Sequence, residues 1–257
     1  ASMNRLLAET CLTPELQEQN RIRDLVNQVR IRREASIGNN GHGLAMTAAA
    51  AYFRPVPALN HQLNGLAGTS WLKTLDQSLS DSTALEALVD SLTEINKGLA
   101  GSARQLLVIS EHQADVVSSL AEPWAEQGTA EEDYLSHAII EVPLHQAWLT
   151  TTEVNHCAEV FPTVAENHAD SAALTVLAGI LRNGYLHRVI REQGGAYGGG
   201  ATHDGANGLF RFYSDRDPNL RSTFDAFRES IKWVLSSDIP FDLVEESILG
   251  IVSSIDA

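Results

Sequence analysis

The chain has 257 residues, 44% of them hydrophobic and 20% charged, which is the composition of an ordinary soluble globular protein with room for one large domain or two small ones. A formal net charge of −15 argues against nucleic-acid binding, which needs a basic footprint, and is compatible either with the attraction of cationic peptides or with a charge that only confers solubility. No apolar run is long enough to cross a membrane, and the two cysteines, Cys11 and Cys157, are too few for a disulfide framework, so we expect buried thiols.

The first third of the chain is predicted to be helical. Thr13-Pro14 is typical of a helix start, and a basic amphipathic helix is expected from there to about Glu34. The glycine- and asparagine-rich residues 36–43 predict a loop, in which His42 is expected to be a hydrogen-bonded turn residue. Helices are then expected at 44–53, before Pro55 and Pro57, and at 71–79.

The middle of the chain is predicted to hold a long helix and then a change of structure. Asp81 or Ser82 can cap a helix that carries leucines at helical spacing and ends at Gly98 or Gly101. The segments expected to follow are a strand at 104–109, a helix at 114–125, an acidic linker at 128–133, and strands at 138–142, 147–152 and 157–160.

The most informative stretch is 170–217. A helix is expected from Asp170 or Ser171 to Gly194-Gly195, where glycine can take the left-handed conformation that ends a helix. A strand that includes Tyr197 follows, then a hairpin turn at 205–208 and a return strand at 209–213, with Phe210 and Phe212 on one face. Further helices are expected at 219–235 and from Pro240 onward, and the whole pattern indicates an α+β fold.

Arg191 and Tyr197 are the candidate site residues. The short glycine link places Arg191 near a helix end and Tyr197 at a strand start, so both side chains could face one space. A guanidinium and a phenol together suit a peptide carbonyl or a developing oxyanion. The alternative is that Arg191 forms a surface ion pair and Tyr197 is part of the core.

The motif that contains these two residues is long and specific. The run Arg-Glu-Gln-Gly-Gly-Ala-Tyr-Gly at 191–198, followed by Phe-Arg-Phe-Tyr-Ser-Asp-Arg-Asp-Pro-Asn at 210–219, resembles the insulinase-like (pitrilysin-type) zinc metallopeptidases, in the presequence-protease branch. The resemblance implies domains in which helices pack on one face of a largely antiparallel sheet. It implies that residues 1–130 are the C-terminal part of the third such domain, and that 131–257 are most of the fourth, truncated at its end.

The resemblance also implies a function. Arg191 and Tyr197 would hold the substrate backbone and help to polarise the scissile carbonyl, within the substrate-holding C-terminal half of a zinc metalloendopeptidase that degrades unfolded peptides in a closed chamber. The implied partners are a peptide substrate and the N-terminal half of the same protein, with no nucleic acid and no membrane. A cytoplasmic or organellar-matrix location is expected.

The zinc motif itself is absent from this sequence. The family's H-x-x-E-H helix places two histidines and a glutamate at the metal, but no two of the nine histidines here are four or fewer residues apart. We therefore expect no metal and no catalytic residue on this chain, zinc in the N-terminal half, and no activity from this chain alone. The alternative function is a non-catalytic insulinase-like subunit that binds peptides or scaffolds a complex.

Overall fold

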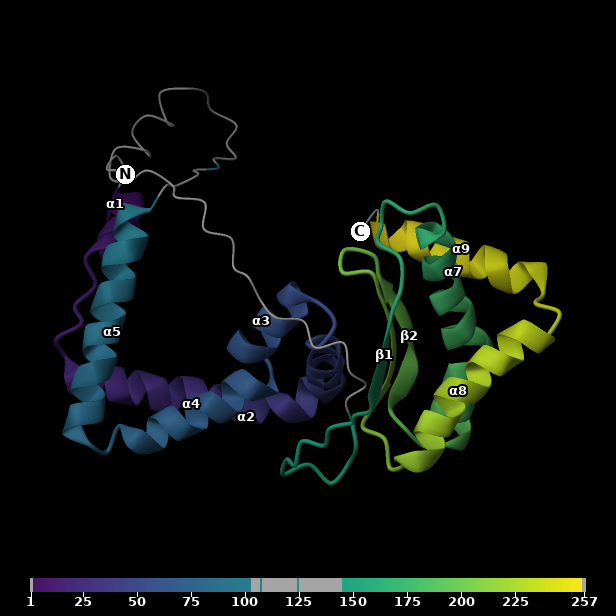
Figure 1. Cartoon of the computed structure of the whole chain (residues 1–257), viewed down its shortest axis with the longest axis horizontal. Coiled ribbons are helices and arrows are strands. Elements are labelled where there is room, and N and C mark those ends of the chain that lie inside the picture. Colours follow the sequence, from purple (N-terminus) through teal and green to yellow (C-terminus); the bar gives the residue numbers. More distant parts are fainter. Residues whose placement is uncertain (1, 103–106, 108–123, 125–144, 256–257) are drawn as a thin grey trace. The chain divides into compact units, whose positions relative to one another are not determined.

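The computed structural model describes residues 2–102, 107, 124 and 145–255, whose elements are shown in Figure 1. The chain divides into two compact units, the first joining Ala1–Ile31 to Leu72–Leu135 and the second joining Arg32–Trp71 to Ser136–Ala257. Apart from Leu107 and Trp124, the segments 104–109, 114–125, 128–133 and 138–142 lie outside the described residues, so the elements predicted there stay predictions.

The first unit contains helices around a small aliphatic core. α1 (Ser2–Leu12) packs against α5 (Ser82–Gly101), while α2 (Gln19–Ala50) and α4 (Leu66–Ser78) contribute residues to both units. The buried side chains of the core are Ile22, Leu79, Leu85 and Val89.

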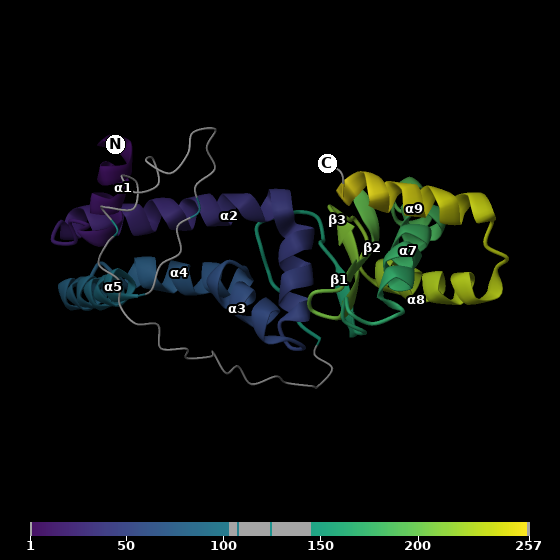
Figure 2. The same cartoon turned by 90° about the horizontal axis from the view of Figure 1, so that it is seen from above.

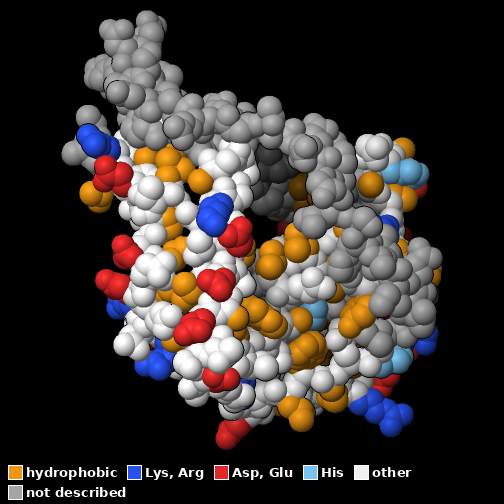
Figure 3. All heavy atoms as spheres, turned by 60° about the vertical axis from the view of Figure 1, so that its left-hand side comes forward, with side chains coloured by type: hydrophobic (Ala, Val, Ile, Leu, Met, Phe, Trp, Pro, Cys, Tyr) orange, Lys and Arg blue, Asp and Glu red, His pale blue; other side chains and the backbone are white. Residues whose placement is uncertain are grey.

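The helix α5 confirms the prediction made from its leucine spacing. Its N-cap is Asp81, whose carboxylate accepts a hydrogen bond from the Thr83 N–H over 2.9 Å. Leu85 is buried near its start, whereas Ile95 and Leu99 near its end are 59% and 64% exposed. Figure 3 shows other apolar side chains that are open to solvent among charged ones.

The long helix α2 contradicts two predictions. It begins at Gln19, so Thr13-Pro14 does not start it, and residues 36–43 lie inside it and do not form a loop. The backbone leaves helical geometry at Asn40 (φ −130°, ψ 28°), where the helix is kinked. The helix ends at Ala50, and Pro55 lies in the first turn of α3 (Pro55–Leu63), where a proline is well tolerated.

The second unit is built on a three-stranded antiparallel sheet. Its strands are β1 (Ala158–Pro162), β2 (Gly198–Asp204) and β3 (Leu209–Asp215), in the order β1-β3-β2. β2 and β3 form the predicted hairpin, with Gly208 in the left-handed region at φ 58°. Helices combined with an antiparallel sheet confirm the α+β class, although residues 147–152, which were expected to be a strand, have no regular structure.

Helices cover one face of this sheet. α7 (Ser171–Leu181) continues directly into a π-helix, η2 (Arg182–Gln193), and α8 (Arg221–Ser236) and α9 (Phe241–Ile255) follow the hairpin. In both Figure 1 and Figure 2, α7, α8 and α9 lie on the same side of the strands. These bounds confirm the predicted helices, but the π-helical form of η2 was not foreseen.

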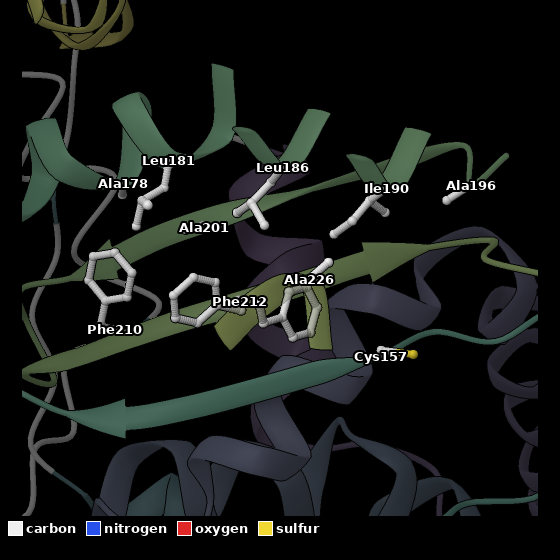
Figure 4. Close-up of a cluster of buried hydrophobic side chains, with 11 residues drawn as sticks. Cys157, Ala178, Leu181, Leu186, Ile190, Ala196, Ala201, Phe210, Phe212 and Ala226 are labelled. Atoms are coloured by element: carbon white, nitrogen blue, oxygen red, sulfur yellow. The ribbon is translucent and has the colours of Figure 1, made fainter. Parts of the chain in front are cut away.

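The main hydrophobic core lies between these helices and the sheet (Figure 4). Leu181, Leu186 and Ile190 point from α7 and η2 toward the strands, where Phe210 and Phe212 meet them. Each fully buried aliphatic or aromatic side chain of this kind stabilises the fold by about 1.5–3 kcal/mol. Cys157 belongs to the same cluster, and burial raises the pKa of its thiol, whereas Cys11 is exposed and not buried as expected.

The opposite face of the sheet has a smaller apolar cluster. The end of α2 packs there, and the buried residues are Ala50, Val160 and Leu209. Leu209 and Phe210 therefore point to opposite faces, as the alternation in the sequence predicts. Of the helices that the structure describes, none has the length and apolarity needed to cross a bilayer.

Candidate functional site

The link between η2 and β2 determines where the two candidate residues lie. Gly194 and Gly195 both donate their N–H groups to the Arg191 carbonyl, and Gly195 takes φ 80°, which favours glycine. The Ala196 N–H then donates to the Ile190 carbonyl over 3.1 Å. The chain therefore reverses within a few residues, and Tyr197 follows as the residue before β2.

Arg191 and Tyr197 lie side by side at this reversal. The guanidinium carbon of Arg191 is 5.9 Å from the centroid of the Tyr197 ring, and both side chains are exposed, Tyr197 to 63%. Tyr197 is therefore not a core residue. Its backbone is fixed, because its N–H donates to the Asp215 carbonyl over 3.0 Å.

A third side chain, Arg216, reaches the same place. Its guanidinium carbon is 5.2 Å from the centroid of the Tyr197 ring. The sequence gave no sign that Arg216 approaches Tyr197. Arg216 lies in the triplet Asp-Arg-Asp, in which the two aspartates are buried and the arginine is exposed, and this burial results from the fold and cannot be read from the sequence.

Two histidines contact the carboxylate of Asp215, the last residue of β3 and the one before Arg216. The Asp215 carboxylate lies 2.9 Å from Nδ1 of His156 and 3.1 Å from Nδ1 of His42, which comes from α2. The Arg216 N–H is 3.4 Å from the same His156 nitrogen, which accepts from it when unprotonated and donates to Asp215 when protonated. His42 is therefore a helical residue that faces a carboxylate, not a turn residue.

Asp217, the residue after Arg216, is held in place by backbone and side-chain hydrogen bonds. It exchanges two backbone hydrogen bonds of 2.8 Å with Asn155, and its fully buried carboxylate accepts from the Asn219 N–H and the Thr223 hydroxyl. The Asn219 side chain in turn donates to the Gly194 carbonyl over 2.7 Å. The segment after β3 is thus tied directly to the end of η2 that carries Arg191.

A small hollow is lined in part by Asn219 and Gly194, the two residues that this hydrogen bond joins. It has a volume of about 280 Å³, and its lining residues come from η2, the link and α8: Val189, Ile190, Gln193, Gly194, Asn219, Ser222, Thr223 and Ala226. Sites for drug-sized ligands usually occupy about 300–1,000 Å³. The hollow is therefore slightly smaller than a usual site for a drug-sized ligand.

The described residues do not fit a catalytic metal. In the ranges 2–102 and 145–255, no three His, Cys, Asp or Glu side chains are arranged to hold a metal ion, and the pair of histidines at Asp215 does not change this. The two histidines that are closest in the sequence are His137 and His145, and His137 lies outside the described residues. No chemical step is therefore assigned to a metal held by these residues.

The cluster of Arg191, Tyr197 and Arg216 is instead suited to binding an oxygen-rich chain. Each guanidinium presents five N–H donors in a planar fork, and the Tyr197 hydroxyl is a further donor. Peptide carbonyls, and the oxyanion that forms when a carbonyl is attacked, accept hydrogen bonds from such groups. Nothing in the cluster is a nucleophile activated by an adjacent base, so it can bind and polarise but not attack.

Comparison with known families identifies relatives of both parts of the chain. Residues 146–257, which contain the whole cluster, match the family described as PreP C-terminal domain. Residues 1–75 match a family described as associated with peptidases of family M16, subfamily C.

Individual relatives from fungi and animals share one name, and three fungal ones serve as examples. The chain is 31% identical over 227 residues to the mitochondrial presequence protease of Yarrowia lipolytica, covering 86% of this chain and 23% of the relative. It is 33% identical over 237 residues to that of Kluyveromyces lactis, covering 86% of this chain and 24% of the relative. It is 28% identical over 258 residues to that of Saccharomyces cerevisiae, covering 92% of this chain and 25% of the relative. The chain thus spans about a quarter of the length of these curated relatives.

Proposed function

This chain belongs to the presequence-protease family of metallopeptidases, and from that premise we propose that it is the substrate-holding part of an enzyme that hydrolyses unfolded peptides. The observation that carries the proposal is the placement of Arg191 beside Tyr197, exposed at a rigid helix-to-hairpin reversal, within the part that matches the PreP C-terminal domain.

In this proposal the two residues have separate tasks. The Arg191 guanidinium binds carbonyl oxygens of the peptide backbone, which makes recognition independent of side-chain sequence. The Tyr197 hydroxyl donates to the carbonyl oxygen under attack and stabilises the negative charge that develops on it. Because the backbone hydrogen bonds of Gly195, Ala196 and Tyr197 hold the reversal, the backbone from which both side chains extend is in place before the peptide arrives.

The remaining chemistry is proposed to come from outside this chain. A zinc ion supplies Lewis-acid activation in this family, and we assign its ligands to an N-terminal half that closes with this one into a chamber. Residues 1–130 would belong to the third insulinase-like domain and residues 131–257 to the fourth. Since the relatives are mitochondrial presequence proteases, a mitochondrial matrix location and targeting peptides as substrates are proposed as well.

The test uses the complete protein that contains this chain and the zinc-binding half. Arg191→Ala and Tyr197→Phe are each expected to lower kcat for a quenched fluorescent peptide without secondary structure by about 10²-fold, the effect of removing one donor to an oxyanion. Bound zinc and the melting temperature should stay unchanged, because both side chains are exposed and neither is placed at the metal.

Two neighbours in η2 provide matched controls. Arg188 is exposed on the same helix, and Tyr185 packs against Trp233 with ring centroids 5.6 Å apart. Arg188→Ala and Tyr185→Phe should leave kcat within about twofold of the parent. If Arg191→Ala and Tyr197→Phe were equally harmless, the chain would be a peptide-binding or scaffold subunit and the proposal would be wrong.

A further inference from the structure

Arg216 has a backbone conformation that needs explaining. Among the described residues it is the one residue other than glycine with a positive φ, at 46°. A side chain with a Cβ is disfavoured in this left-handed region, so such a conformation persists only where the surroundings impose it. Glycine or asparagine would fit this position with less strain.

The surroundings do impose it, from both sides. Asp215 is held in β3 and lies against the two histidines, and Asp217 is held by Asn155 and by the two hydrogen bonds that its carboxylate accepts. Both aspartates are buried, and Arg216 between them is exposed. The strained turn therefore directs one long cationic side chain out of a rigid segment.

That side chain is directed at Tyr197. Its guanidinium carbon lies within the roughly 6 Å at which a cation is attracted to an aromatic face, and closer than that of Arg191. Its Nη2 also donates to the Asn39 side chain of α2 over 3.3 Å, which limits its movement. The Tyr197 ring thus has two guanidiniums near it, those of Arg191 and Arg216.

We propose that Arg216 is a positioning residue, which holds the exposed Tyr197 ring so that its hydroxyl is aimed at the substrate carbonyl. This rests on the proposed function, because it assigns Arg216 a role only through Tyr197. Without the contact, an exposed tyrosine samples several rotamers, and the fraction of molecules with a correctly placed hydroxyl falls. A planar guanidinium suits this task better than an ammonium group, since it can stack on the ring.

The strained backbone offers a clean test. Arg216→Gly removes the side chain and relieves the strain, so folding should be retained or improved, whereas an alanine there would confuse the two effects. In the complete protein, Arg216→Gly should lower kcat for the quenched fluorescent peptide about three- to fivefold, the rate equivalent of an exposed cation–π contact. KM should change little, and Arg216→Lys should restore only part of the rate.

A double-mutant cycle separates positioning from direct binding. In a Tyr197→Ala background, Arg216→Gly is expected to cause no further loss, because there is no ring left to hold. The same fold loss in both backgrounds, or a loss confined to KM, would show that Arg216 contacts the peptide itself and would overturn the positioning role. An unchanged kcat would overturn it too.

The same experiments distinguish this inference from the function on which it rests. If Tyr197→Phe and Arg191→Ala lower kcat and Arg216→Gly does not, the positioning role fails and the substrate-holding function stands. If all three variants leave kcat unchanged, the proposed function fails, and the role of Arg216 fails with it.

Discussion

The two faces of the sheet are covered in contrasting ways. On one face, α7, η2 and α8 bury an aromatic and aliphatic core around Phe210, Phe212 and Phe227. On the other face lie a small apolar cluster, to which the end of α2 contributes, and a set of charged groups, in which Asp204 pairs with Arg211 and Asp215 meets two histidines.

The apolar face therefore mainly stabilises the fold, whereas the polar face mainly holds the residues of the site in position. Apolar burial is non-directional, so the core supplies free energy of folding without fixing single atoms. Hydrogen bonds and ion pairs have directional preferences, so the polar face fixes the end of β3, and with it Tyr197 and Arg216. Substitutions on the polar face should therefore reduce activity more, for a given loss of stability, than those on the apolar face.

The largest effect is expected at Gly41, where α2 approaches the sheet. A Cβ there would lie 2.3 Å from Cδ2 of His156, a ring that is held against Asp215. Gly41→Ala should therefore lower the free energy of unfolding by about 2–3 kcal/mol, as overpacking does, and should also lower kcat. Urea denaturation and peptide hydrolysis measure the two losses.

Gly38 is the matched control on the same helix. Its nearest neighbour for an added Cβ is Cγ2 of Thr152 at 3.8 Å, an ordinary contact. Gly38→Ala should then stabilise the protein by about 0.5–1 kcal/mol, because alanine loses less backbone entropy in a helix than glycine. Equal effects at the two positions would mean that the approach of His156 does not determine the packing.

A smaller effect is expected on the apolar face, at Gly199. An added Cβ would lie 2.7 Å from Cγ2 of Ile190 and 3.1 Å from its Cβ, whereas at Gly198 nothing lies within 4 Å. Gly199→Ala should lower the free energy of unfolding by about 1–2 kcal/mol. The loss in kcat should be smaller than at Gly41, although Ile190 precedes Arg191. Gly198→Ala should be neutral in thermal denaturation, and an equal loss there would argue against the close packing of η2.

The helix-to-hairpin region could be predicted from sequence because its local signals agree with its tertiary structure. Gly195 and Gly208 do take left-handed conformations, and the alternation of Leu209 and Phe210 does follow the two faces. Where local preference and packing agree in this way, pattern reasoning succeeds.

The region of α2 could not be predicted, because glycine has two uses. The glycines at 38, 41 and 43 gave the same signal as a turn, but they lie in a helix, and Gly41 is needed for the close approach of His156. No sequence pattern reports such an approach. The same holds for Arg216, since its strain and its contact with Tyr197 arise from bonds to residues distant in sequence.

Glu159 is the charged exception on the apolar face. Burial raises its pKa, although Arg228 at 3.9 Å and His145 lower it in part. A folded-state pKa above the unfolded value of 4.5 stabilises the protein below that pH, and this contribution is lost as the pH rises through the folded value. Glu159→Gln should therefore stabilise the protein at pH 7 by about 1 kcal/mol, with the gain disappearing at acid pH. As a control, Glu245→Gln at an exposed position should hardly change the melting temperature at pH 7.

The smallest effect is expected at Asn39, where the polar face reaches the site through Arg216. Its side-chain oxygen accepts from the Arg216 guanidinium over 3.3 Å at an exposed position, so its loss should hardly change the melting temperature. Asn39→Ala should lower kcat by about twofold, because the guanidinium keeps its contact with Tyr197 but moves more freely. In an Arg216→Gly background the same substitution should have no effect on kcat. A loss of kcat that persists in this background would mean that Asn39 of α2 affects the site by a route other than its hydrogen bond to Arg216.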